Sequence, residues 1–408
     1  MGNGPDGRRF FVQASSFCAG LVFRIALSRG FDASYDASTV MKRLLPLVFA
    51  ASAIAITSAA AQSPQGKPLR VAIAGLNHGH VGGFLGGAQR RTDIVLVAVW
   101  DSDAELLAKY AKSNHLAADR LYTDLNKMLD AAKPEAVATF TDTYSHAMVV
   151  EACAPRHIAV MMEKPLAVDM KQARAIQQAA ERYHTAVIVN YETTWYRSHA
   201  AMWDLLHEQK AGGEIRKMVA MDGHQGPQEI NVQPEFFAWL SDPAKNGAGA
   251  LFDFGCYGAN LMTWMMDNQR PQKVTALTQT DKPAIYPRVD DEATVLLQYP
   301  KAQGIIQASW NWPVGRKDFE VYGATGYAIA TGGDNLRVRL ADARAEEIRT
   351  PAALKPREAD SISYLIGVAR GEFKPSGLSS LENNMIVIEI LDAARESART
   401  GRTITLGK

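Results

Sequence analysis

Cysteine is scarce in this sequence of 408 residues, which contains only Cys18, Cys153 and Cys256. No two of them have the C-x-x-C spacing of a zinc or redox motif, so the sequence indicates neither a disulfide framework nor a metal site. We expect Cys153 and Cys256 to be buried free thiols, and we expect no bound metal.

An excess of charge is also missing, because 44 basic and 43 acidic residues give a net charge of +1. The chain therefore has no strong attraction to nucleic acid, and we expect no such partner. Its 47% hydrophobic and 21% charged residues exclude a disordered chain and a polytopic membrane protein. The length exceeds the roughly 100 to 200 residues of one domain, so we expect two domains with a cleft between them.

A membrane-spanning run is lacking as well, since the apolar run Leu44–Ile56 is shorter than the roughly 20 residues that a spanning helix needs. The run follows Met41-Lys42-Arg43 and precedes Ala59-Ala60-Ala61, which is the order of a signal peptide. We expect residues 1–61 to be a leader with its true start at Met41, a signal peptide at 41–61, and a periplasmic or secreted product without membrane association. Arg8-Arg9-Phe10-Phe11 is the alternative opening of a twin-arginine signal, and the run itself is alternatively a buried helix or an anchor.

From Leu69 onward, short apolar strands alternate with amphipathic helices, a pattern typical of βαβ units around a parallel sheet. We therefore predict an α/β fold in which residues 62–190 form a doubly wound Rossmann domain that binds its ligand at the carboxyl ends of the strands. The expected strands are Arg70–Ala74, Val95–Trp100, Ala136–Phe140, Ile158–Met161 and Val187–Val189, and the expected helices are Val81–Arg90, Ala104–Asn114, Leu125–Ala132, His146–Ala154 and Met170–Tyr183.

After Asn190 the pattern changes to longer runs of strand character. We predict that residues 191–385 form an α/β domain with a large, mostly antiparallel open sheet, and that residues 386–408 pack back on the body. The elements expected here are a helix near Ala201–Lys210, a hairpin of Ala293–Tyr299 with Gly304–Trp312, strands Phe319–Tyr322 and Gly326–Ala330, and a closing helix Asn384–Thr400.

The first expected strand runs into Gly75-Leu76-Asn77-His78-Gly79-His80, where a dinucleotide site has G-x-G-x-x-G. Asn77 and His80 stand where the second and third glycines would be. Because asparagine tolerates the left-handed backbone, this turn is a candidate phosphate-binding turn, and a turn that binds nothing is the alternative. Asp101, 26 residues after Gly75, suits a carboxylate that accepts from a ribose 2′-hydroxyl. No basic residue follows it directly, which favours NAD over NADP, and a helix N-cap is its alternative role.

Two further segments carry groups suited to proton transfer. Glu163-Lys164-Pro165 follows a strand at the same edge, where the Lys164 ammonium can ease proton loss from a hydroxyl. A helix that begins near Asp253 would place Asp253 and Tyr257 on one side, four residues apart, where they can hold and relay that proton. The alternatives are a surface turn at Lys164, an N-cap at Asp253 and core packing by Tyr257.

Together, Glu163-Lys164-Pro165 and the segment 249–260 resemble the two hallmark motifs of the Gfo/Idh/MocA oxidoreductases. The resemblance covers essentially the whole chain after the leader. The tyrosine in Gly255-Cys256-Tyr257-Gly258 resembles the glucose-fructose oxidoreductase branch, since most members have histidine there. Further matching segments are Tyr122-Thr123-Asp124 with Leu129, Thr141 through His146, Asn190, Asp290-Asp291, and Glu389-Ile390 through Ser397.

The resemblance implies a nicotinamide cofactor, a sugar or polyol substrate and a homo-oligomer. It makes Lys164 and Asp253 catalytic, and we expect Tyr257 to exchange the proton. Free nicotinamide nucleotides are scarce outside the cytoplasm, so we expect NAD, or alternatively NADP, to be tightly bound. Expected cofactor contacts are Gly75, Asn77, His78, Asp101, Thr141, His146, Glu163, Lys164 and Asn190. Expected sugar contacts are Trp195, Tyr196, His224, Trp310, Asn311 and Trp312, although Trp310 and Trp312 would also pack on one face of a strand.

Two departures from the family pattern leave rival functions open. Asn77 and His80 replace glycines, and Asn260 stands where the family has an aspartate. The main hypothesis is hydride transfer with a sugar or polyol. The rivals are a redox-neutral NAD-dependent glycosidase, lyase or epimerase, which the same residues would serve, and a cofactor-free exported sugar-binding protein.

Overall fold

The computed structural model describes residues 66–407 of the chain. The expected leader at 1–61, with its signal peptide at 41–61, lies outside these residues. No helix within the described range is long and apolar enough to span a membrane. Cys153 and Cys256 are both buried and free, as expected.

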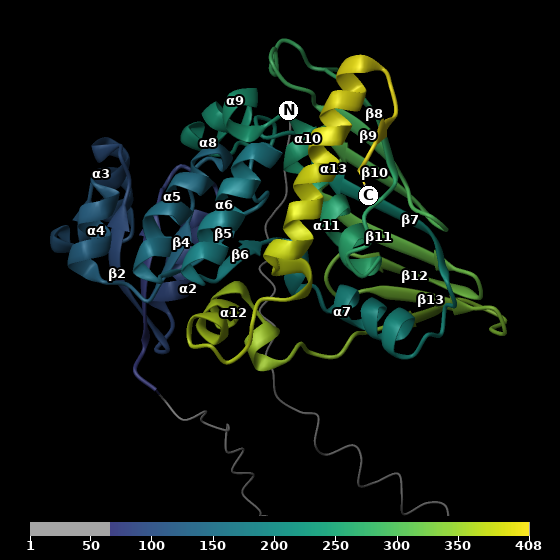
Figure 1. Ribbon diagram of the computed structural model, residues 1–408, viewed down its shortest axis with the longest axis horizontal. Helices are drawn as coiled ribbons and strands as arrows, with labels where there is room; N and C mark the ends of the chain where they lie inside the picture. The colour runs from purple at the N-terminus through teal and green to yellow at the C-terminus, as the bar shows by residue number, and fades with distance from the viewer. Residues whose placement is uncertain (1–65, 408) are drawn as a thin grey trace, which may run out of the picture. The chain divides into compact units, whose positions relative to one another are not determined.

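Residues 69–190 contain a parallel sheet of six strands in the order β3-β2-β1-β4-β5-β6 (Figure 1). The order reverses between β1 and β4, and ligands of doubly wound sheets bind at such a switch point. The predicted Rossmann sheet is confirmed. Its strands are β1 (Leu69–Ala74), β2 (Ile94–Trp100), β3 (Leu121–Tyr122), β4 (Ala136–Thr139), β5 (Ala159–Glu163) and β6 (Val187–Asn190).

Strand β1 illustrates why the sequence forms this layer. Successive side chains of a strand point to opposite faces. Leu69, Val71 and Ile73 enter one buried cluster, and Ala72 and Ala74 enter another. Both faces are therefore apolar and covered by helices, as parallel sheets require. The first face is covered by α2 (Val81–Gln89) and α3 (Ala104–Ser113), and the second by α4 (Leu125–Ala132), α5 (His146–Cys153) and α6 (Met170–Tyr183).

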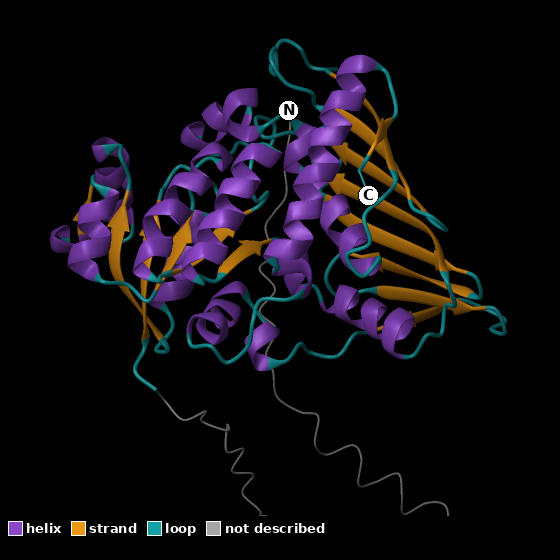
Figure 2. Cartoon of the chain, in the orientation of Figure 1, coloured by secondary structure: helices purple, strands orange, loops and turns teal. Residues whose placement is uncertain are grey.

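The second sheet has nine strands in the order β14-β13-β12-β11-β7-β10-β9-β8-β15, drawn in orange in Figure 2. Only the β7–β10 pair is parallel, so the predicted, mostly antiparallel sheet and the β9–β10 hairpin are confirmed. The strands are β7 (Ile215–Gly223), β8 (Lys273–Gln279), β9 (Glu292–Gln298), β10 (Gln303–Ser309), β11 (Arg316–Gly323), β12 (Gly326–Thr331), β13 (Leu336–Leu340), β14 (Glu347–Arg349) and β15 (Ile404–Thr405).

Helices cover one face of this sheet. The yellow helix in Figure 1 is α13 (Leu381–Thr400), which packs on the sheet, on α11 (Gly255–Met265) and on α6. The chain thus returns to the body through its last helix. Before it, α12 (Ser361–Ala369) adds its apolar residues to the core of the first sheet. The remaining helices are α7 (Arg197–Trp203), α8 (Pro234–Leu240), α9 (Pro243–Asn246) and α10 (Ala250–Asp253).

Two local expectations differ from the structure. The helix expected near Ala201–Lys210 is α7, which starts earlier and continues as one π-helical turn at Asp204–Glu208. Strand β10 ends at Ser309, although the backbone N–H of Trp310 still donates to the carbonyl of Asp291 in the register of the β9–β10 pair. Trp310 and Trp312 therefore lie after the strand, and the expectation that both point from one face of it is wrong.

Candidate active site

Lys164 and Asp253 form a buried ion pair between the two sheets. The Lys164 Nζ donates to the carbonyl oxygen of Asp253 at 2.8 Å and also to its carboxylate. The indole Nε1–H of Trp310 donates to the other carboxylate oxygen at 2.9 Å. Both oxygens of the Asp253 carboxylate are thus bonded, so this group holds Lys164 in place.

The backbone around Asp253 is shaped by Asp290, one of the two aspartates noted in the sequence. Its carboxylate accepts from the backbone N–H of Gly249 at 2.9 Å and of Leu251 at 2.7 Å. This anchors the start of α10, which ends at Asp253, and a separate helix α11 begins after Phe254. The expected single helix from Asp253 onward is therefore two short helices with a break.

The pKa values of the pair agree in direction. Burial alone would lower the pKa of Lys164, but the charge of Asp253 raises it above its usual value. Burial alone would raise the pKa of Asp253, but Lys164 and His224 bring it below its usual value. The pair therefore stays charged at neutral pH.

Tyr257 lines the same cavity as Lys164 and Asp253, despite the break at Phe254. This cavity of about 230 Å³ is also bordered by His224 and Lys317, and we call it the reaction cavity. The Nζ atoms of Lys164 and Lys317 each lie 5.2 Å from the centre of the Tyr257 ring. Burial raises the pKa of Tyr257 well above its usual value, with Glu192 adding to the effect, so the phenol is neutral.

A larger cavity of about 720 Å³ adjoins the reaction cavity and shares His224, Phe254 and Lys317 with it. We call it the polar cavity. The His224 Nδ1 accepts from the N–H of Gly226 at 2.9 Å, so a neutral His224 keeps its proton on Nε2. Burial lowers its pKa, which favours this neutral ring. Other residues of the polar cavity include Glu192, Tyr196, Trp312, Arg316 and Asp318.

The expected sugar contacts fall into three groups. Tyr196, His224 and Trp312 line the polar cavity. Trp195 borders a third cavity of about 660 Å³ and donates to Asn190 at 3.0 Å. Trp310 is fully buried with its N–H bonded to Asp253, so it offers no face to a sugar and instead positions the aspartate.

Asn311 is half-buried and also engaged within the protein. Its side-chain amide donates to Asp291 at 3.2 Å and to Glu292 at 3.3 Å. From the sequence we expected Asn311 to contact the sugar. These bonds instead fix the position of the chain segment that follows β10.

The turn between β1 and α2 has the backbone of a dinucleotide site. Gly75 has φ of 89°, and a Cβ there would collide with the backbone and side chain of Thr141. Asp101 accepts from the N–H of Leu76 at 2.7 Å and of Asp103 at 2.9 Å. The N-cap of α3 is Asp103, which accepts from two N–H groups of that helix, so the N-cap alternative for Asp101 is wrong.

Helix α8 lies on this turn. The ring centres of Phe236 and Trp239 are 4.7 and 5.6 Å from that of His78. Trp239 Nε1 also donates to the carbonyl oxygen of Asn77 at 2.9 Å. Helix α8 therefore covers the turn. The expected cofactor residues buried there are Gly75, His78, Asp101, Thr141 and His146.

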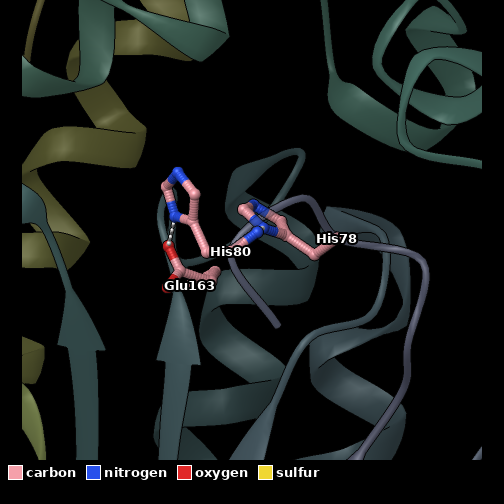
Figure 3. Close-up of side chains that lie close together, drawn as sticks. All are labelled: His78, His80 and Glu163. Atoms are coloured by element: carbon pink, nitrogen blue, oxygen red, sulfur yellow. Dashed lines mark hydrogen bonds and ion pairs between the residues drawn. The ribbon is translucent and has the colours of Figure 1, made fainter. Parts of the chain in front are cut away.

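At the other end of the expected cofactor site, the residues border open space. Glu163 and Asn190 line the cavity of about 660 Å³ together with His80. Glu163 accepts from Asn190 Nδ2 at 2.8 Å, and its second carboxylate oxygen lies 3.1 Å from His80 Nδ1 (Figure 3). The Gly75 turn and this open end together fit a nicotinamide dinucleotide. The side-chain Oδ1 of Asn77 is buried and has no partner among the described residues, so it can accept from a donor on that ligand.

Sequence reasoning missed Lys317, Glu192 and the pair Phe236 and Trp239. Lys317 donates to Glu192 at 2.5 Å and borders both the reaction and polar cavities. It lies within a run of charged residues, Arg316-Lys317-Asp318, which is usually a solvated surface. Only the pairing of β11 with β7 brings it to the site, so no local signal identified it.

Two family models match the chain. Residues 69–191 match the model described as oxidoreductase family, NAD-binding Rossmann fold, and residues 200–329 match the GFO/IDH/MocA C-terminal domain. D-apiose dehydrogenase of Paraburkholderia graminis is 25% identical over 350 residues, which are 81% of this chain and 86% of that protein. Human trans-1,2-dihydrobenzene-1,2-diol dehydrogenase is 26% identical over 210 residues, which are 52% and 58% of the two chains.

Solved structures share the fold. Aldose-aldose oxidoreductase of Caulobacter crescentus, in complex with glycerol, gives a TM-score of 0.71 at 20% identity, covering 83% of this chain and all of that one. An inositol dehydrogenase homolog of Azotobacter vinelandii, in complex with NAD⁺, gives 0.72 at 18% identity, covering 84% and 99%. With both halves matched by models of one family, the chain belongs to the GFO/IDH/MocA family of NAD(P)-dependent oxidoreductases.

Proposed function

We propose that the protein transfers hydride between the CH–OH group of a sugar or polyol and a tightly bound nicotinamide cofactor, with NAD favoured over NADP. The observation that carries this proposal is the buried Lys164–Asp253 pair, which lies beside the neutral phenol of Tyr257 at the wall of the reaction cavity. The cavity opens where the family's Rossmann sheet binds its ligand.

Lys164 is the group that polarises the substrate oxygen. An ammonium has three N–H bonds, and two of those on Lys164 donate to Asp253. Within the described residues the third is free for a ligand in the reaction cavity. Because the pair stays charged, this N–H is a permanent donor that stabilises negative charge on a reacting oxygen.

Tyr257 is the proton-exchanging group. As a neutral phenol it can donate its proton to the oxygen of a carbonyl that is being reduced, and the nearby ammonium groups of Lys164 and Lys317 then stabilise the tyrosinate. The reverse step returns the proton to Tyr257 when a hydroxyl is oxidised. A bound nicotinamide would supply or accept the hydride.

The polar cavity is the proposed sugar site. Tyr196 and Trp312 offer aromatic faces, and His224, Arg316 and Lys317 offer donors, the mixture with which proteins bind polyhydroxylated ligands. The names of the related proteins, which act on apiose or resemble an inositol dehydrogenase or an aldose oxidoreductase, support this class of substrate.

Tight retention of the cofactor is supported by α8, because a ligand held at the Gly75 turn under Phe236 and Trp239 leaves only when that helix lifts. The proposed cofactor contacts are the nine residues named from the sequence. Export to the periplasm rests on the signal-like segment at 41–61 alone. Homo-oligomer formation is supported by apolar side chains exposed on the second sheet, Leu277, Leu296 and Ile305.

Retention can be tested directly. Protein starting at residue 62 would be purified without added nucleotide, denatured, and examined for released NAD(H) or NADP(H) by absorbance and mass spectrometry. We expect about one dinucleotide per chain, and a stable keto-sugar on incubation with substrate and acceptor. Cleavage or isomerisation without reduction of an acceptor would favour the redox-neutral rival. A protein that is empty and fails to bind added nucleotide would refute the proposal and favour a sugar-binding protein.

A further inference from the structure

Three side chains with metal-binding atoms meet at the turn between β1 and α2. His78 and His80 lie in the turn, and Glu163 is the last residue of β5 (Figure 3). One nitrogen of each histidine and one carboxylate oxygen all lie within 4.8 Å of one another. The sequence did not suggest this group, because Glu163 is far along the chain and the histidines were assigned to a cofactor turn.

We propose that His78, His80 and Glu163, when no dinucleotide fills the turn, bind a divalent transition-metal ion of the zinc, iron(II) or manganese class. Two imidazoles and one carboxylate are the protein ligands of many catalytic zinc sites and of non-haem iron(II) sites, in which further positions stay open for water or substrate. A role as metal ligand would also explain why His80 stands at the position of the third glycine.

The distances are close to those of a metal site. Bonds of roughly 2.0–2.2 Å to nitrogen and oxygen require ligand atoms about 3–4 Å apart, and His80 Nδ1 is already 3.1 Å from Glu163 Oε2. The three ligand atoms lie within 4.8 Å of one another, so shifts of about 1 Å would bring them to this spacing. The His80 side chain is 49% exposed, so it can supply part of that shift without disturbing the core.

Each ligand also has a lone pair available. His78 Nδ1 accepts the N–H of His80 over 3.2 Å, so this nitrogen already carries an unprotonated lone pair that a metal can take over. His80 Nδ1 lies against Glu163, and when a metal takes this nitrogen the hydrogen of the neutral ring moves to Nε2, so His80 binds as the neutral imidazole. The second oxygen of Glu163 accepts from Asn190, which orients the carboxylate as outer contacts of metal ligands do.

Neighbouring charges are compatible with a dication. Lys164 is paired with Asp253, and Lys317 is paired with Glu192. The two lysines are therefore neutralised locally, which leaves Glu163 as the net charge at the site. His80 borders both the reaction cavity and the cavity of about 660 Å³, so an open coordination position would face the space that holds Tyr257 and the substrate.

The test is a calorimetric titration of ZnCl₂ into protein starting at residue 62 that has been freed of bound dinucleotide, dialysed against a chelator and returned to metal-free buffer. We expect one ion per chain, measured from the midpoint of the titration. Titration with Co²⁺ should give visible absorption bands from a site with nitrogen and oxygen ligands. Neither readout depends on turnover.

Variants distinguish a built site from surface binding. His80→Gln and Glu163→Gln should each weaken Zn²⁺ binding at least tenfold, with the native fold of each variant checked by circular dichroism. The matched control is His115→Asn, at an exposed histidine with φ of 54°, where asparagine tolerates the left-handed backbone. It should bind like the unmodified protein. Absence of Zn²⁺ binding to the unmodified protein would overturn the proposal, and so would unchanged binding in both His80→Gln and Glu163→Gln. If Glu163→Gln does not fold, His80→Gln decides alone.

Discussion

Helix α8 should control how fast a nicotinamide dinucleotide enters and leaves, and Trp239→Phe tests this. The substitution keeps a ring against His78 and Phe236 but removes the indole N–H that donates to the Asn77 carbonyl at 2.9 Å. A partly buried hydrogen bond of this kind contributes about 1 kcal/mol. If this bond forms only while α8 covers the turn, its loss shifts the equilibrium by about 1 kcal/mol toward an open arrangement in which α8 is lifted.

A change of about 1 kcal/mol corresponds to about a fivefold change in an equilibrium constant. We therefore expect NAD(H) to bind and to dissociate about five times faster in Trp239→Phe than in the unmodified protein. The assay is stopped-flow fluorescence of NADH binding, together with displacement of bound NADH by excess NAD⁺. The control is Trp203→Phe, in α7 against Trp264, which should leave both rates unchanged. Rates within twofold of the unmodified protein for Trp239→Phe would refute the idea that α8 gates the turn.

Three other predictions concern residues of the candidate active site. Lys164→Ala should reduce kcat by the roughly 10²–10⁴-fold that loss of a proton-transfer group causes, measured with the native fold checked by circular dichroism, and unmodified rates would exclude a catalytic role. Tyr257→Phe should lower kcat strongly with little change in melting temperature, whereas a loss of stability alone would make Tyr257 a core residue. Burial would raise the pKa of Glu163, but His80 and its other partners lower it to about 2. Because this is below the unfolded value of roughly 4.3, the carboxylate stabilises the fold fully above about pH 4.3 and progressively less toward pH 2. Glu163→Gln should flatten this part of a stability–pH curve, and an unchanged curve would show that the carboxylate is not held as an ion.

The strands and helices of the first sheet were predictable because their signals are local. In β1, both faces are apolar, and in α6 the buried residues Ala173, Ile176 and Ala180 follow helical spacing. The failures occurred where a distant residue decides the outcome. Trp310, expected to contact a sugar, is instead held by the carboxylate of Asp253, which accepts its indole N–H, and nothing in the sequence near Trp310 indicates this.

The candidate site divides in the same way. Lys164, Asp253 and Tyr257 were predicted to act together because each belongs to a motif with a fixed place in the family, and the structure brings all three to one cavity. Lys317 has no such motif. It reaches the cavity because β11 pairs with β7 in the register that sets Lys317 opposite Asp222, a pairing between segments nearly a hundred residues apart in sequence.

The turn at Gly75 shows how a correct local prediction can leave the chemistry open. Asn77 and His80 were recognised as departures from a dinucleotide motif, and their consequence depends on two residues that the motif does not contain. Trp239 bonds the Asn77 carbonyl, and Glu163 bonds the His80 ring. The first contact closes the turn, and the second creates a carboxylate–imidazole pair beside His78.

If NADH and Zn²⁺ compete for this turn, each should raise the apparent dissociation constant of the other by the same factor, because coupling between two ligands is reciprocal. A titration of each ligand in the presence of the other measures that factor, and a value of one would mean that the two bind independently.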